Sequence, residues 1–264
     1  IADIHGCDSC RAMWLTSFTE EDRPKASEAM QLFKEANRML NQLDAVYQTH
    51  GVVNIMDANA DGDDLLLNGK RFPLLRQQAA KLKKDDPFLC LSDFVRPLSS
   101  GITDKIGAFA TTVDAEMEQL YAEDDYKRML AQTLSDRLAE ATAEKLHEDV
   151  RKKLWGYAPD ENLSVKDLHN EKYQGIRPAV GYPSLPDQSI NFLLDELLDM
   201  DQRGISLTDI GMMKPHASVC GLMFAHPASR YFSIGKIGED QLADYAARRG
   251  MSIEETKKFL AANL

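Results

Sequence analysis

The chain has 264 residues and a formal net charge of −11, with no basic block along its length. This balance argues against non-specific nucleic-acid binding, which needs clustered lysine and arginine, and against attraction to anionic membranes. No apolar run approaches the roughly 18 residues that cross a bilayer, and four cysteines in this length are typical of a reducing, cytoplasmic compartment.

The first 24 residues are irregular and contain a small cluster of His5, Cys7 and Cys10. The Cys-x-x-Cys spacing occurs in zinc and redox sites, but no second ligand pair follows at a similar spacing. A loosely held terminal segment is therefore the favoured interpretation. Because the first residue is Ile1 and not methionine, we expect the sequence to be part of a longer polypeptide.

An amphipathic helix is predicted over residues 26–47 and a strand over residues 51–56. The next segment, Asp-Ala-Asn-Ala-Asp-Gly over residues 57–62, has the first half of an EF-hand loop, but Asn68 stands where a bidentate glutamate is needed. Residues 64–67 have the composition of a return strand, and Asn-Gly at 68–69 is a typical hairpin turn. Two hairpin turns are the favoured interpretation, with a calcium site as the alternative.

One acidic side chain, Asp93, lies in an apolar run over residues 88–95 that is predicted to be a strand. A buried carboxylate without a partner is costly, so Asp93 needs one. Backbone N–H groups of the following turn and the ammonium group of a ligand would both serve, and the sequence does not decide between them. A short helix over residues 74–84 precedes this run, and a strand over residues 106–112 follows it.

A long helical pattern extends over residues 113–153, with a break near residue 124 and charges that complement the helix dipole. Four side chains on its neighbouring turns have the spacing of carboxylate and histidine metal ligands: Glu140, Glu144, His147 and Glu148. A solvated, charged helix face is the more common outcome of such a pattern and is the favoured interpretation.

The most distinctive segment is residues 173–183, Tyr-Gln-Gly-Ile-Arg-Pro-Ala-Val-Gly-Tyr-Pro. Its glycines and prolines disfavour both helix and strand, so they predict a shaped loop. Arg177 on a stiff loop suits a carboxylate or phosphate, because the planar guanidinium can donate two parallel hydrogen bonds. A connector with a solvated arginine is the alternative, and composition alone favours it.

Toward the C-terminus the pattern predicts helices over residues 164–170, 186–200, 239–249 and 252–262, and strands over residues 205–207, 217–224 and 230–234. The last two strands are expected to pair across a turn at residues 226–227. Helices and strands are mixed without βαβ alternation, which favours the α+β class with an antiparallel sheet. No Gly-x-Gly-x-x-Gly follows a strand, so a dinucleotide-binding fold is disfavoured.

Residues 175–183 closely resemble part of the activation (reactivation) domain of cobalamin-dependent methionine synthase. The family pattern Arg-x-x-x-Gly-Tyr is met by Arg177, Gly181 and Tyr182. Further stretches match in the same order along the chain: residues 32–37, 91–95, 106–110, 136–141, 155–159, 217–219, 226–227, 231–232 and 244–250. The resemblance predicts an activation domain over residues 25–264, preceded by a weakly matching segment over residues 1–24.

The resemblance implies a single C-shaped α+β domain, with a central antiparallel sheet flanked by helices, that binds S-adenosylmethionine. Such a domain serves methionine biosynthesis as a module of a methyltransferase and not as an autonomous enzyme. It supports reductive methylation of inactive Co(II) cobalamin to methylcobalamin. The implied partners are the module that binds cobalamin and a flavodoxin-type electron donor.

The resemblance also assigns site residues. Arg177 would bind the ligand carboxylate and Asp93 the ligand ammonium group, since a zwitterion needs one fixed cation and one fixed anion. The rest of the ligand would be walled by Ala179, Gly181, Tyr182, Tyr231 and Phe232. Negative potential near the sulfonium would come from Glu140 and Glu171. No residue is assigned a catalytic or metal-binding role.

Two departures from the family pattern concern residues 184–188, Ser-Leu-Pro-Asp-Gln, and the strand that contains Cys220, Leu222 and Met223. They bear on the surface expected to face cobalamin more than on the ligand site. They leave open an alternative function, a module that senses S-adenosylmethionine without transferring its methyl group. A metal-dependent structural domain, based on residues 57–62 and the Cys7/Cys10 pair, is a third hypothesis.

Overall fold

The computed structural model describes residues 23–43, 46–78 and 86–264. The cluster of His5, Cys7 and Cys10 lies outside the described residues, as does most of the helix predicted over residues 74–84. Residues 74–78 of that predicted helix are described, and they are not helical.

Within the described residues, five strands form one antiparallel sheet in the order β3-β2-β1-β4-β7. The strands are β1 (Thr49–Asp61), β2 (Asp64–Leu67), β3 (Lys70–Pro73), β4 (Asp104–Val113) and β7 (Ser218–Met223). Two short strands, β5 (Ser206–Leu207) and β6 (Met213–Lys214), form a separate pair. The predicted α+β class with an antiparallel sheet is confirmed.

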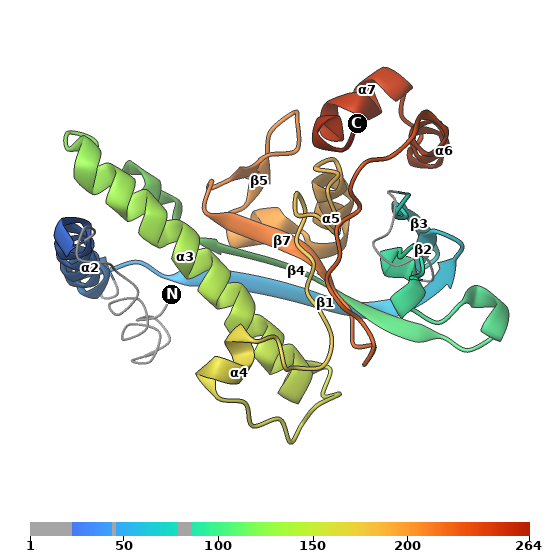
Figure 1. Cartoon of the computed structure of the whole chain (residues 1–264), viewed down its shortest axis with the longest axis horizontal. Coiled ribbons are helices and arrows are strands. Elements are labelled where there is room, and N and C mark those ends of the chain that lie inside the picture. The colour runs from blue at the N-terminus through green and yellow to red at the C-terminus, as the bar shows by residue number, and fades with distance from the viewer. Residues whose placement is uncertain (1–22, 44–45, 79–85) are drawn as a thin grey trace.

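The helices lie on both sides of the sheet (Figure 1). Their bounds are α2 (Arg23–Leu43), α3 (Asp125–Asp149), α4 (Val165–His169), α5 (Ile190–Leu198), α6 (Glu239–Arg249) and α7 (Ile253–Phe259). The predicted break before α3 is confirmed, because the Asp124 side chain accepts a hydrogen bond from the Lys127 amide and caps the helix. At its other end, α3 continues into a π-helical turn, Val150–Leu154.

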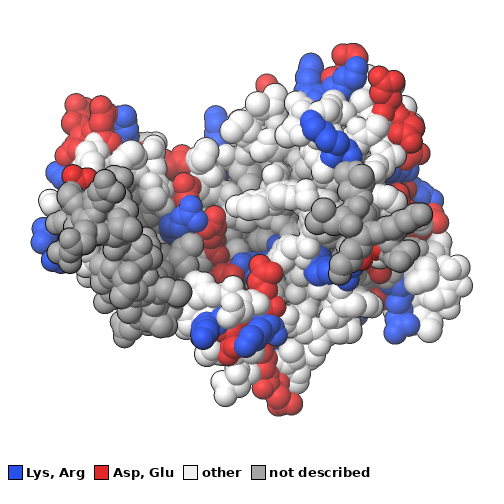
Figure 2. All heavy atoms as spheres, in the orientation of Figure 1, with Lys and Arg blue, Asp and Glu red and all other residues white. Residues whose placement is uncertain are grey.

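Strand β4 is buried on both faces, which explains its small-residue and apolar sequence. Phe109 packs with Ala143 of α3 on one face, while Ala108 and Ala110 join the cluster that contains Leu194 of α5 on the other. Successive strand residues point to opposite faces, so an unbroken apolar run is needed here. Figure 2 shows a notch at the upper edge, between the beginning of α3 and the part of the molecule that carries β5, in keeping with the C-shaped outline.

The two hairpin turns after β1 and β2 are confirmed, although β1 continues to Asp61. The polar side chains of the EF-hand-like segment have separate partners. Asp57 pairs with Lys105 at 2.8 Å, Asp61 pairs with Arg71, and Asn59 donates to backbone carbonyls. In the described part of the chain, no three His, Cys, Asp or Glu side chains are grouped for a metal ion.

Two predicted strands are wrong. Residues 88–95 contain a 3₁₀ turn, Leu91–Phe94, because the Asp93 side chain accepts from the Cys90 amide at 2.8 Å and closes the turn. Residues 230–234 form no ladder with β7. Their backbone is bound instead to the segment of Pro183 and Ser184, through the Ile234 amide at 2.9 Å and the Phe232 amide at 3.0 Å.

The remaining predicted helices are confirmed with shifted ends, except that the part of the helical pattern before residue 124 forms a 3₁₀ helix, Ala115–Gln119, and not an α-helix. The helix predicted to start at residue 186 begins at Ile190, after a buried turn in which Asp187 accepts from the Ser189 amide and hydroxyl. Ser164 and Ser252 cap α4 and α7 through their side chains. None of the helices in the described residues combines the length and the apolar character needed to cross a membrane.

Candidate functional site

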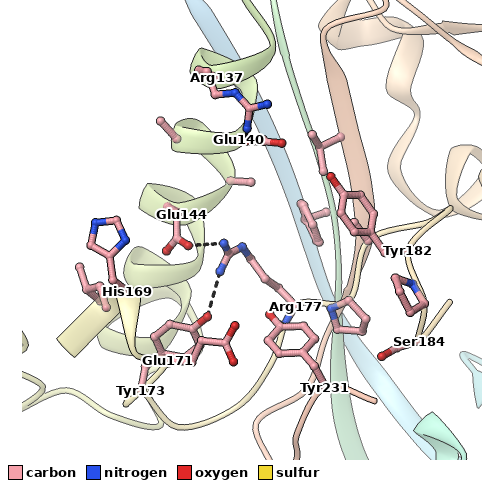
Figure 3. A pocket seen from close by; sticks show the side chains of 18 of the residues that line it. Arg137, Glu140, Glu144, His169, Glu171, Tyr173, Arg177, Tyr182, Ser184 and Tyr231 are labelled. Carbon is pink, nitrogen blue, oxygen red and sulfur yellow. Dashed lines mark hydrogen bonds and ion pairs between the residues drawn. The ribbon is translucent and has the colours of Figure 1, made fainter. Parts of the chain in front are cut away.

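A cavity of about 680 Å³ opens between α3, α4 and the loop over residues 173–184 (Figure 3). Phe109 of β4 and Val219 of β7 contribute to its lining from the sheet, and Tyr231 and Phe232 contribute from the irregular segment that follows β7. This volume lies within the range of about 300–1,000 Å³ that is usual for small-molecule sites.

The loop of Arg177 is held against the outer edge of β7. Ile176 exchanges two backbone hydrogen bonds with Phe224, and the Val180 amide donates to the Cys220 carbonyl at 2.9 Å. Gly221 permits this approach, since a Cβ there would meet the Pro178 carbonyl oxygen at 2.2 Å. The loop therefore takes the place beside β7 that the sequence had assigned to residues 230–234.

Arg177 is anchored at three points, and its side chain is only 17% exposed. Its backbone amide donates to the Tyr231 hydroxyl at 3.1 Å, and Nη1 donates to the Tyr173 hydroxyl at 3.3 Å. Nη2 donates to a carboxylate oxygen of Glu144 (Figure 3). Burial lowers the pKa of the Arg177 guanidinium, but the Glu144 charge and the tyrosines outweigh burial, so this pKa is raised overall.

The α3 wall of the cavity carries Arg137, Glu140 and Glu144. Their spacing of three and four residues places them on one face of the helix. Arg137 donates to Glu140 at 2.5 Å. Glu171, which follows α4 in a left-handed backbone conformation with φ of +52°, also lines the cavity. This wall can attract a positively charged ligand group.

A buried cluster lies behind Tyr173. Arg151, from the π-helical turn, is fully buried and donates two hydrogen bonds of 2.7 Å to Glu161. Its guanidinium carbon lies 4.5 Å from the centre of the Tyr173 ring, and the His147 ring meets the same ring edge-on at 5.1 Å. Burial, followed by the charges of Arg151 and Arg177, lowers the pKa of His147 well below its usual value. Tyr173 is thereby held in place to accept from Arg177.

The structure brings together most of the residues that the resemblance assigned to the site. The cavity is lined by Arg177, Ala179, Tyr182, Tyr231, Phe232, Glu140 and Glu171. Gly181 is not among the lining residues; its amide donates to the Leu185 carbonyl, and its φ of +85° turns the loop. These placements concern geometry, and the ligand-binding roles themselves stay predictions.

Asp93 is not among the lining residues either, and its carboxylate has a partner that the sequence did not suggest. Arg76 donates to its two oxygens at 2.8 and 2.7 Å. The Asp93 carboxylate also accepts from a backbone N–H, which was one of the two predicted kinds of partner. This N–H belongs to Cys90, which precedes Asp93, and not to the turn that follows it. The neighbouring Phe94 ring packs 6.4 Å from that of Phe232, so the turn that carries Asp93 abuts a wall of the cavity.

Sequence reasoning missed the roles of Glu144 and Tyr173. Glu144 was interpreted as part of a solvated face, and Tyr173 as one end of a loop, yet both bind Arg177. Arg137 and His169, which also line the cavity, were not singled out. The spacing of residues 137, 140 and 144 on one helix face was a usable indication that these side chains act together.

Comparison with known proteins identifies the family. Residues 13–250 match the family described as vitamin B12 dependent methionine synthase, activation domain. The chain is also similar to the crystal structure of the MetH reactivation domain bound to AdoHcy, with 42% sequence identity and a TM-score of 0.86 over 96% of this chain and 84% of that one. This chain therefore belongs to the activation-domain family of vitamin B12-dependent methionine synthase.

Proposed function

We propose that this chain binds S-adenosylmethionine in the cavity beside Arg177 and serves the reductive methylation of cobalamin. The observation that carries the proposal is the anchored guanidinium of Arg177 in a cavity with an acidic wall. A related domain at 42% identity holds AdoHcy, which is S-adenosylmethionine without the transferable methyl group. An amino-acid tail needs one fixed cation for its carboxylate, and Arg177 provides it.

The lining residues suggest how the ligand lies. Its carboxylate binds Arg177, while its sulfonium faces Glu140 and Glu171, which also line the cavity. Tyr231, Phe232 and Tyr182 offer aromatic surface to the adenosine part. The ammonium role of Asp93 stays part of the proposal; it requires that Asp93 serve the ligand in addition to Arg76, which holds it in the structure.

The chemistry needs partners beyond this chain. A cobalamin module supplies the cobalt that accepts the methyl group, and a flavodoxin-type protein is the proposed one-electron donor. The part of this chain is to hold the sulfonium so that its methyl group faces the docked module. We expect this assembly to work in the cytoplasm.

Calorimetric titration tests the binding step. We expect S-adenosylmethionine to bind with 1:1 stoichiometry and binding to be lost in Arg177→Ala, because the ligand carboxylate then lacks its cation. Arg203→Ala is the matched control, since Arg203 is exposed in the turn after α5 and, among the described residues, donates to the neighbouring Gln202 carbonyl alone. Unchanged affinity in Arg177→Ala would contradict the site assignment.

The transfer step separates this function from that of a sensor. The sensor alternative was motivated by Cys220, Leu222 and Met223, which differ from the family pattern. These side chains are at most 1% exposed, so their divergence changes the packing around β7 and not an exposed docking surface. Methyl-labelled S-adenosylmethionine, mixed with this chain, a cobalamin module and a reductant, should place the label on cobalt; the absence of label there would favour the sensor.

A further inference from the structure

Glu144 accepts a hydrogen bond from a guanidinium nitrogen of Arg177 that a ligand carboxylate would use. It accepts from Nη2 of Arg177, while the Tyr173 hydroxyl accepts from Nη1 (Figure 3). A ligand carboxylate that binds two guanidinium nitrogens in parallel must share or take the donor now bound by Glu144. The cavity thus already contains a carboxylate at the position expected for that of a ligand.

Displacing Glu144 from Arg177 would change the charge balance of the cavity. Among the described residues that line it, Glu140 has Arg137 as a partner at 2.5 Å, whereas the ion-pair partner of Glu144 is Arg177. Glu144 is 29% exposed, so losing its cation leaves a partly desolvated carboxylate uncompensated. A cation on the same ligand can compensate it.

We propose that Glu144 is an internal competitor for Arg177 and determines selectivity for ligands that carry a sulfonium in addition to the ammonium group beside their carboxylate. The proposal rests on the proposed function and assigns a further residue to it. A ligand carboxylate displaces Glu144 from Arg177, and the released Glu144 then faces the cationic groups of the ligand. AdoHcy keeps the ammonium group but has a neutral thioether in place of the sulfonium, so it compensates the released Glu144 less well, and S-adenosylmethionine is favoured over it.

The geometry of the pair supports exchange. Glu144 accepts one hydrogen bond from Arg177, through the carboxylate at the end of its flexible side chain. Both partners line the cavity and are partly exposed. Solvent reaches the pair, so its net contribution to stability is small compared with that of a buried pair. A ligand that brings charges of both signs can therefore replace it.

Glu144→Gln tests the proposal by calorimetry with S-adenosylmethionine and AdoHcy. Removing the competitor should tighten AdoHcy binding by about tenfold. S-Adenosylmethionine also escapes the competitor but loses an attractive charge, so its affinity should change little and the preference for it should fall by about tenfold. Glu148→Gln is the control, with the same charge change one turn away, where Glu148 binds Lys145 and Lys152. It should leave both affinities unchanged.

Glu144→Asp separates competition from charge. The shorter side chain keeps its charge at the wall but withdraws from Arg177, so AdoHcy should tighten while the preference for S-adenosylmethionine is kept. An unchanged ratio of the two affinities in Glu144→Gln would overturn the proposal. Unchanged AdoHcy binding in Glu144→Asp would overturn it as well. The aspartate variant therefore tests the proposal even if the glutamine variant fails to fold. If the wild-type chain binds neither ligand, the proposed function fails as well.

Discussion

Two arginine–glutamate pairs flank Tyr173 and differ in almost every physical respect. Arg151 and Glu161 are 0% and 8% exposed and share two hydrogen bonds of 2.7 Å. Arg177 and Glu144 are 17% and 29% exposed and line the cavity. The first guanidinium stacks over the Tyr173 ring, and the second donates to the hydroxyl of the same ring.

The difference separates a structural pair from one suited to binding. A fully buried charge needs its partner at all times, because no water replaces the lost hydrogen bonds. The partly exposed pair can exchange partners, since a ligand can supply the same groups. The buried pair holds Tyr173 in place, so that its hydroxyl can accept a hydrogen bond from Arg177. Substitutions in these regions can test the difference, and their expected effects decrease from the buried pair to the solvated surface.

Removing one member of the buried pair should have the largest effect. Arg151→Met leaves the buried Glu161 carboxylate without its cation and should lower the free energy of unfolding by about 3–5 kcal/mol. Urea denaturation followed by circular dichroism measures this loss. Adding Glu161→Leu to the same chain should restore most of the stability, because no buried charge is left unpaired. If Arg151→Met left the free energy of unfolding almost unchanged, Glu161 would not be buried as the structure indicates.

Displacing the loop of Arg177 should have the next largest effect. In Gly221→Ala, the new Cβ would meet the Pro178 carbonyl oxygen at 2.2 Å, so the loop must move away from β7. Overpacking of this kind typically costs about 1–3 kcal/mol, and the displaced Arg177 should also bind S-adenosylmethionine more weakly. Gly51→Ala is the matched control in β1, where the nearest side-chain atoms lie at an ordinary 3.5 Å. Equal effects at the two glycines would contradict the role given to the close approach.

The buried cluster should also make stability depend on pH. Burial and the neighbouring arginines keep His147 neutral in the folded state by lowering its pKa, while the unfolded chain takes up a proton near pH 6.5. Below that pH the unfolded state binds more protons, so stability should fall by up to about 1.4 kcal/mol per pH unit as the pH decreases. The variant His147→Gln should show a shallower decline between about pH 6.5 and about pH 5 in urea denaturation. The same slope in both proteins would mean that His147 titrates normally.

A fully solvated pair should have the smallest effect and marks the other end of the comparison. Lys70 and Glu196 meet at 3.0 Å with side chains that are 70% and 57% exposed. Solvent screens such pairs, so Glu196→Gln should change the free energy of unfolding by less than about 0.5 kcal/mol. If Glu196→Gln lowered the free energy of unfolding as much as Arg151→Met, burial would not explain the difference between the buried and the exposed ion pairs.

Local pattern in the sequence determined the periodic elements and the character of the arginine loop. The hydrophobic pattern placed β7, α4 and α7, and glycines and prolines predicted the loop of Arg177. These features depend on neighbours within a few residues, so they can be recognised without the fold. The resemblance added the family and the expected ligand, which periodicity alone does not supply.

The tertiary structure alone decided which charges meet. Glu144 lies 33 residues before Arg177, and Arg76 lies 17 residues before Asp93, yet each arginine binds its acid. The place beside β7 went to the arginine loop and not to residues 230–234, because Gly221 lets the loop backbone come close. Residue types fix what a side chain can bind, but packing of distant segments selects the partner, and that selection is absent from any local pattern.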